Sequence, residues 1–121
     1  MARISELLAE GRCFSIEMFP PKTAEAEARL VASLGDFEKL RPKFVSITYG
    51  AGGSTRERTH SLVVQLNENF PTTAMAHLVC SSHSRDELVS ILTRYRDAGI
   101  ENILALRGDR PAAGDSSGGK D

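Results

Sequence analysis

The residues best suited to chemistry in this 121-residue chain follow apolar stretches, at the point where each stretch gives way to Gly or Pro. They are Glu17, then Thr48 and Tyr49, and then Arg107 and Asp109, which flank a glycine. In parallel α/β proteins, functional groups lie just beyond the carboxyl ends of the strands. The pattern therefore predicts that two carboxylates, an arginine, a threonine and a tyrosine share one rim of a sheet.

Glu17 lies in an otherwise apolar stretch, beside Met18 and Phe19. A carboxylate in that setting is expected to be partly desolvated, which favours its protonated form and suits it to donate a proton near neutral pH. A buried glutamate paired with a lysine or arginine explains the same pattern. Both interpretations stay open at this point.

The other two segments offer different chemistry. Thr48 and Tyr49 supply hydroxyls beside glycines that would let a ligand approach the backbone, and glycines before a helix also suit an anion at its N-terminus. Arg107 can hold a phosphate or a ring carbonyl, and Asp109 can stabilise a cationic intermediate. A plain turn explains the glycines equally well, and a surface ion pair explains Arg107 and Asp109.

The histidines lie in three different sequence settings. His77 lies between apolar residues and is interpreted first as a core residue and second as a ligand-binding one. His60 is expected on a helix surface and His83 in a loop. No spacing of His, Cys, Asp and Glu indicates a zinc site, and no Gly-x-Ser-x-Gly motif indicates a hydrolase.

Strand and helix patterns alternate along the chain. Strands are predicted over residues 14–19, 44–48, 73–80 and 102–106, and their starts are about 30 residues apart. Between them, apolar residues three and four positions apart predict helices. Thr23 is predicted to cap the first of these helices, a Ser84–Glu87 capping box to begin the last, and Gly99 to end it. Parallel strands with right-handed crossovers fit this order.

A doubly wound sheet and a β/α barrel both begin in this way. Polar residues at alternate strand positions favour the barrel, whose interior can hold them against a ligand; these are Ser15, Glu17, Ser46, Thr48 and His77. No Gly-x-Gly-x-x-Gly follows the first strand, which disfavours a dinucleotide-binding fold. The sequence predicts an α/β fold, the N-terminal half of a (β/α)8 TIM barrel with four parallel strands and crossover helices, over residues 1–111. Residues 112–121 are predicted to be a flexible polar loop or tail.

Composition argues against several classes of protein. The net charge of −1 and the scattered basic residues disfavour a nucleic-acid partner. No stretch approaches the roughly 18 apolar residues of a membrane span, and the N-terminus lacks the apolar run of a signal peptide. Cys13 and Cys80 are expected to be a reduced, buried pair, as is usual for a cytoplasmic protein.

Taken together, the motifs resemble the N-terminal part of the methylenetetrahydrofolate reductase family. The matching segments are 15–23 (SIEMFPPKT), 42–51 (PKFVSITYGA), 58–61 (RTHS), 76–80 (AHLVC) and 102–111 (NILALRGDRP). The resemblance implies an eight-stranded barrel that binds FAD at its C-terminal rim. NADH or NADPH would reduce the flavin, which would pass hydride to 5,10-methylenetetrahydrofolate and give 5-methyltetrahydrofolate, a step of one-carbon and methionine metabolism. The folate is then the small-molecule partner, and the full-length protein is expected to be a homo-oligomer.

The resemblance also implies roles for single residues. Glu17 resembles the family's general acid, which helps to open the five-membered ring of the folate to an iminium. Asp109 resembles an aspartate near flavin and folate, whose charge would stabilise the iminium and tune the flavin. The positions that match flavin-binding residues are Thr48, Tyr49, Ala51, His77, Arg107, Gly108 and Asp109. Thr48 is also expected to touch the nicotinamide.

One departure from the family is the length of the chain. A β/α barrel takes about 250 residues, and four strands cannot close one. The first and fourth strands are therefore expected to expose their edges, and the chain is expected to be a fragment that binds FAD weakly and is inactive alone. Two alternatives stay open, a flavin-free β/α-barrel lyase or aldolase and a non-catalytic half-barrel that pairs with a partner chain.

Overall fold

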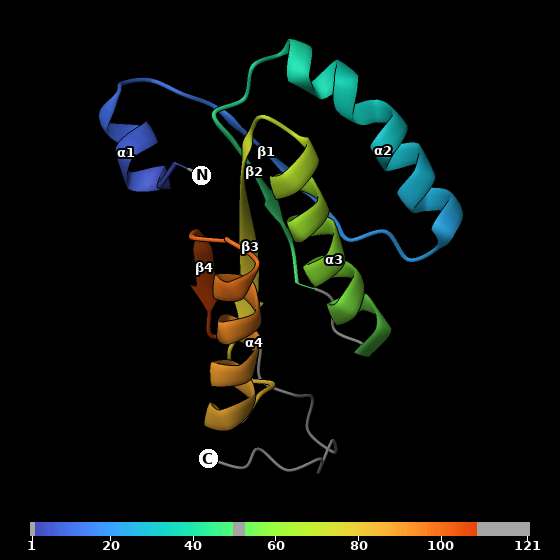
Figure 1. The fold of residues 1–121 in the computed structure, drawn as a ribbon, viewed down its shortest axis with the longest axis vertical. Coiled ribbons are helices and arrows are strands. Elements are labelled where there is room, and N and C mark those ends of the chain that lie inside the picture. The colour runs from blue at the N-terminus through green and yellow to red at the C-terminus, as the bar shows by residue number, and fades with distance from the viewer. Residues whose placement is uncertain (1, 50–52, 109–121) are drawn as a thin grey trace.

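The computed structural model of this chain describes residues 2–49 and 53–108 (Figure 1). Helices and strands alternate within these ranges, in the order α1 (Ile4–Ala9), β1 (Ser15–Met18), α2 (Ala24–Lys39), β2 (Phe44–Ile47), α3 (Gly53–Asn69), β3 (Thr73–Val79), α4 (Arg85–Asp97) and β4 (Ile103–Leu106). Each predicted strand is present, shortened by one or two residues. The predicted tail, residues 112–121, lies outside the described residues.

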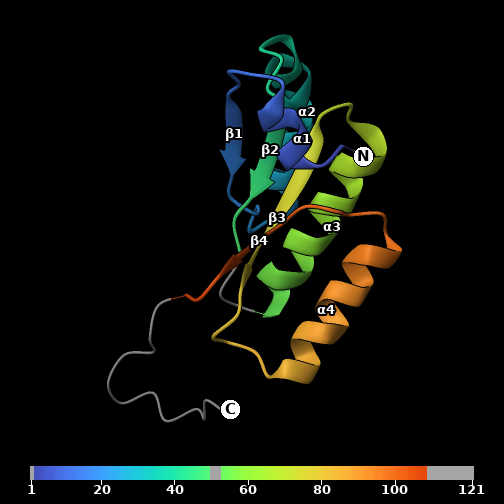
Figure 2. The same cartoon turned by 90° about the vertical axis from the view of Figure 1, so that its left-hand side faces the viewer.

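The strands form one parallel sheet in the order β1-β2-β3-β4, the same order as in the sequence. A doubly wound sheet reverses its strand order at a switch point and places helices on both faces. Here α2, α3 and α4 all contribute side chains to a single cluster on one face of the sheet. Figure 2 shows α3 and α4 along that side. The topology therefore confirms the prediction of the N-terminal part of a β/α barrel, with β1 and β4 at the two edges of the sheet.

Local signals in the sequence set the ends of the helices. The Thr23 hydroxyl accepts a hydrogen bond from the Ala26 amide (3.1 Å) at the start of α2, and Ser84 and Glu87 form the predicted capping box of α4. Gly99 follows α4 with φ of 82°, the left-handed conformation that glycine adopts without steric cost. These three predictions are confirmed.

The core lies between the helices and the sheet face that carries Val45, Ile47, Ala74 and Ala76, which we call the helix face. From α3, Leu62, Val63 and Leu66 pack against it, and α4 adds Tyr95. The helix α1 is attached to the start of β4, because the Asn102 side chain accepts a hydrogen bond from the Ile4 amide (2.9 Å) and donates one to the Ala2 carbonyl (3.0 Å).

One expectation about burial is wrong, that of a buried cysteine pair. Cys13 and Cys80 are free, and each is only half-buried. Separately, none of the helices in the described ranges is long and apolar enough to cross a membrane.

Candidate functional site

The side of the sheet opposite the helices, which we call the inner face, carries the polar residues that alternate along the strands. Neighbouring parallel strands are paired in register, with Glu17 opposite Ser46 and His77 opposite Leu104. Paired residues in adjacent strands point to the same side of the sheet. The structure thus brings Glu17 and His77 to the same face, as the alternation predicted.

Among the described residues of the predicted site, the side chains of Glu17 and His77 lie in contact. Oε1 of Glu17 is 3.5 Å from Nε2 of His77, a distance that permits an ion pair when the imidazole is protonated. The two atoms do not form a hydrogen bond, and Nε2 of His77 is buried with no hydrogen-bond partner among the described residues. A buried polar atom without a partner is costly, so this nitrogen is suited to a ligand that supplies the missing group.

The prediction that Glu17 is desolvated is wrong for this chain. Its side chain is 57% exposed, and the neighbouring Phe19 is 79% exposed. Apolar residues next to Glu17 in sequence do not bury it, because successive side chains of a strand point to opposite faces. In the described residues, no further strand stands opposite Glu17 to cover the inner face.

The end of β2 is fixed by its backbone. The Thr48 amide donates a hydrogen bond to the Met18 carbonyl (2.9 Å), which continues the pairing with β1. The Thr48 carbonyl accepts a hydrogen bond from the Thr59 hydroxyl of α3 (3.3 Å). Thr48 is therefore held between β1 and α3 at the rim, and Tyr49 follows it towards α4.

The end of β4 approaches β3 closely. The Arg107 carbonyl accepts a hydrogen bond from the Ser81 amide (3.0 Å), and Gly108 has φ of 87°. A Cβ atom on Gly108 would lie 2.3 Å from Cγ1 of Val79, so only glycine fits this position. Arg107 itself is exposed at this rim. Two other predicted site residues, Ala51 and Asp109, lie outside the described residues.

Sequence reasoning missed the contact between Tyr49 and His83. His83 does lie in a loop, as predicted, but its side chain is only 3% exposed. Its Nε2 contacts the Tyr49 hydroxyl, and its Nδ1 lies 3.1 Å from Oε2 of Glu87. Burial raises the pKa of the Tyr49 hydroxyl, and Arg56 partly offsets this effect. The spacing of four residues between His83 and Glu87, at the start of a helix, is the signal that could have revealed this pair.

Tyr49 also lines a cavity of about 330 Å³ between α3 and α4. On its walls, Arg94 pairs with Glu57 through two contacts (3.1 and 3.2 Å), and His60 stacks on Tyr95 with ring centroids 4.8 Å apart. Burial lowers the pKa of His60. The prediction that His60 lies on the helix surface is therefore wrong, because its ring packs between the two helices.

A second cavity, of about 870 Å³, lies at the opposite end of the sheet. Its lining includes Leu7 of α1, Pro42 and Phe70, which precede β2 and β3, and Thr73 at the start of β3. Residues at this end of a β/α barrel usually serve stability, whereas chemistry lies at the carboxyl ends of the strands. We therefore assign the candidate site to the rim that carries Glu17, Thr48, Tyr49, His77 and Arg107. No group of three or more His, Cys, Asp or Glu side chains in residues 2–49 and 53–108 is arranged to hold a metal ion.

Comparison with known proteins gives a consistent result. A family model described as methylenetetrahydrofolate reductase matches residues 3–121. A 5,10-methylenetetrahydrofolate reductase of Pectobacterium carotovorum is 44% identical over 114 residues, which are 92% of this chain and 38% of that protein. The protein of the same name from Salmonella typhimurium is 46% identical over 97 residues, or 80% of this chain and 33% of that protein. A probable methylenetetrahydrofolate reductase (NADH) of Oryza sativa is 38% identical over 110 residues, which are 90% of this chain and 18% of that protein. The chain thus spans about a third of the length of the bacterial relatives it matches.

Proposed function

Because the chain belongs to the methylenetetrahydrofolate reductase family, we propose that it forms the flavin-binding N-terminal part of an enzyme that reduces 5,10-methylenetetrahydrofolate to 5-methyltetrahydrofolate. When bound, FAD would supply the hydride, which it would receive from NADPH or from NADH, the donor named for the rice relative. The structural observation that carries the proposal is the pairing of an exposed Glu17 carboxylate with a buried His77 whose Nε2 has no hydrogen-bond partner.

The rim offers the features that a flavin needs. His77 can use its free Nε2 towards the ring, and Gly108 allows the backbone to lie close to β3, where a side chain would collide with Val79. Thr48, Tyr49, Ala51, Arg107 and Asp109 would complete the contacts. Of these, Thr48 is already held by backbone hydrogen bonds at the end of β2, so it would need little ordering on binding.

Glu17 would act as the general acid towards the folate. Its carboxylate stands on the inner face, beside an imidazole, and it is open to an incoming molecule. Protonation of an amine nitrogen of the folate would open the five-membered ring to the iminium that accepts the hydride. The further strands of a closed barrel would cover the inner face and exclude water from the surroundings of Glu17. Asp109 would supply a negative charge near the iminium.

A chimera tests the proposal. The chain would replace the matching N-terminal third of the Salmonella relative, to which it is 46% identical over 97 residues. The purified chimera should carry FAD absorbance, oxidise NADH or NADPH and reduce methylenetetrahydrofolate. Glu17→Gln in the chimera should lower folate reduction by a factor of about 10² to 10⁴, the usual contribution of a general acid. The transfer from NAD(P)H to flavin, measured alone by stopped-flow absorbance, should stay within about twofold.

Each part of this experiment has a contrary outcome. A folded chimera without flavin absorbance would contradict flavin binding and favour the flavin-free lyase. A chimera with flavin in which Glu17→Gln changes neither half-reaction would remove Glu17 from the mechanism. The unmodified Salmonella protein and its own glutamine variant at the equivalent position serve as controls for folding and for assay conditions.

A further inference from the structure

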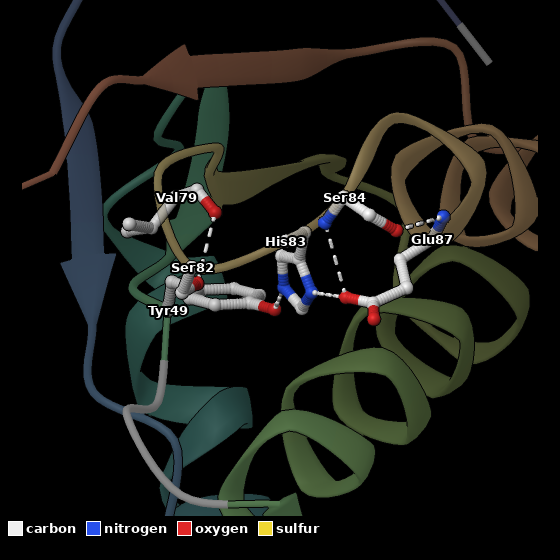
Figure 3. Close-up of polar contacts among 6 residues, drawn as sticks. All are labelled: Tyr49, Val79, Ser82, His83, Ser84 and Glu87. Carbon is white, nitrogen blue, oxygen red and sulfur yellow. Dashed lines mark hydrogen bonds and ion pairs between the residues drawn. The ribbon is translucent and has the colours of Figure 1, made fainter. Parts of the chain in front are cut away.

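Four residues connect the rim to the N-terminus of α4 in a continuous polar network (Figure 3). The Tyr49 hydroxyl meets Nε2 of His83, and Nδ1 of His83 lies 3.1 Å from Oε2 of Glu87. The same Glu87 oxygen accepts a hydrogen bond from the Ser84 amide (3.3 Å), and the Ser84 hydroxyl accepts one from the Glu87 amide (3.2 Å). The helix cap thus fixes Glu87, and Glu87 in turn contacts His83.

The chemistry of the three groups sets the direction of each hydrogen bond. A carboxylate only accepts hydrogen bonds, so Nδ1 of His83 carries the proton and donates it to Glu87. In the neutral imidazole Nε2 is then an acceptor, and the Tyr49 hydroxyl donates to it. The hydrogen bonds from His83 and from the Ser84 amide lower the pKa of Glu87, which keeps this acceptor charged.

This arrangement leaves Tyr49 little freedom. Its hydroxyl points to His83, and the two rings meet edge to face with centroids 5.7 Å apart and planes at 78°. The network uses residues of two consecutive β/α units, β2 with its exit loop and β3 with α4, which are both present in this chain. It does not depend on strands beyond β4.

We propose that His83 and Glu87 are positioning residues that orient Tyr49 at the flavin site, so that Tyr49 presents its ring rather than its hydroxyl to the ligand. The involvement of flavin rests on the proposed function above. The orientation of Tyr49 rests on the contacts within the chain alone.

Two amide variants of His83 each keep the hydrogen bond of one of its two ring nitrogens and remove that of the other. In His83→Gln the side-chain amide reaches the position of Nε2 and can still accept a hydrogen bond from Tyr49. In His83→Asn the amide lies near the position of Nδ1 and can still donate to Glu87, but it cannot reach Tyr49. Ser82→Ala is the matched control, because Ser82 lies in the same loop and its hydroxyl bonds only to the Val79 carbonyl (3.3 Å) among the described residues (Figure 3).

The first measurement is made on the 121-residue chain by NMR. The ¹⁵N shifts of His83 in the unaltered chain should show the proton on Nδ1. The Tyr49 ring resonances, assigned with Tyr49→Phe, should move most in His83→Asn, move less in His83→Gln, which keeps the contact with Tyr49 but loses the one with Glu87, and stay in place in Ser82→Ala. The second measurement titrates each variant with FAD and follows flavin fluorescence. His83→Asn should weaken FAD binding about five- to tenfold, the value of one hydrogen bond, while the other two stay within twofold.

The outcomes distinguish this proposal from the proposed function. A proton on Nε2 of His83 with none on Nδ1 would overturn the role of Glu87, because Nδ1 could not then donate to its carboxylate. Equal effects of His83→Asn and His83→Gln on Tyr49 and on FAD would reduce His83 to a structural loop residue. If the NMR shifts follow the expected pattern but the unaltered chain and the chimera bind no FAD, the proposed function fails and the orientation of Tyr49 stands.

Discussion

The two faces of the sheet differ in how completely this chain builds them. On the helix face, Val45, Ile47 and Ala76 are fully buried beneath three helices. On the inner face, Glu17 is 57% exposed and Leu104 is 38% exposed, although both point to the side that holds the predicted chemistry. The helix face is therefore covered at the central strands, whereas the inner face is open at the edge strands β1 and β4 and buried at central residues such as Ser46 and His77.

The difference separates the residues that hold the chain together from those that would act on a substrate. Burial of apolar surface is the main favourable term in folding, so the stability of this chain resides in the helix face. The inner face contributes polar groups whose surroundings would be completed by a closed barrel. The network from Tyr49 to Glu87 combines both properties. It reaches the rim, where the chemistry is expected, but the residues that form it all belong to consecutive β/α units of this chain.

The largest expected effect compares one aliphatic residue from each face. Ile47→Ala should lower the free energy of unfolding by about 3 kcal/mol, because Ile47 is fully buried and its truncation leaves a cavity in the helix face. Leu104→Ala removes a similar volume from the inner face and should cost about 1 kcal/mol or less. Urea unfolding followed by far-UV circular dichroism measures both values. Equal losses would mean that the inner face is packed in solution.

A smaller effect concerns the helices that cover the helix face, and it depends on pH. Tyr95 is 2% exposed, and burial raises its pKa from 10.0 to about 12. A raised pKa in the folded state gives a stabilisation that is complete below pH 10 and is lost as the pH rises through about 12. Tyr95→Phe cannot ionise, so its unfolding free energy should not show this loss.

The comparison is made by urea unfolding of both proteins between pH 8 and pH 12. Relative to Tyr95→Phe, the unaltered chain should lose on the order of 2–3 kcal/mol across this range. Tyr49 also has a raised pKa. It is present in both proteins, so its own titration cancels, and only the effect of its charge on the pKa of Tyr95 stays in the difference. Parallel curves would show that Tyr95 gains access to water and that the contact between α3 and α4 is loose.

The fold followed from the sequence because its signals are local and agree with one another. Alternation in the strands, the Thr23 cap, the capping box at Ser84 and the glycine at position 99 each act over a few residues, and each is present in the structure. The shared face of Glu17 and His77 also followed, because a parallel register brings alternate positions of the strands to one side of the sheet. The 3.5 Å contact between the two side chains was not predicted.

Burial and side-chain partners were harder to predict. The exposure of Glu17 depends on what stands opposite the inner face, which its sequence neighbours do not report. The stacking of His60 on Tyr95 and the contact of His83 with Tyr49 join residues 35 and 34 positions apart, through the packing of α3 against α4 and of β2 beside β3. No local pattern marks such contacts, so the sequence predicts a helix surface for His60 and a loop for His83 and indicates neither contact.

The smallest expected effect is that of Glu17 on stability, and its measurement shows whether Glu17 stabilises the folded chain or serves only the proposed reaction. Its carboxylate is exposed and lies 3.5 Å from the buried Nε2 of His77 without a hydrogen bond. A pair without a hydrogen bond, in which the carboxylate stays solvated, contributes little. Glu17→Gln in the 121-residue chain should therefore change the free energy of unfolding by less than about 0.5 kcal/mol in urea, at a pH near 7. A loss above 1 kcal/mol would identify a structural pair with His77, and the activity lost in the chimera could then reflect misplacement of His77. With stability unchanged, a loss of folate reduction in the chimera that lowers kcat and leaves KM unchanged is assigned to the proton that Glu17 supplies.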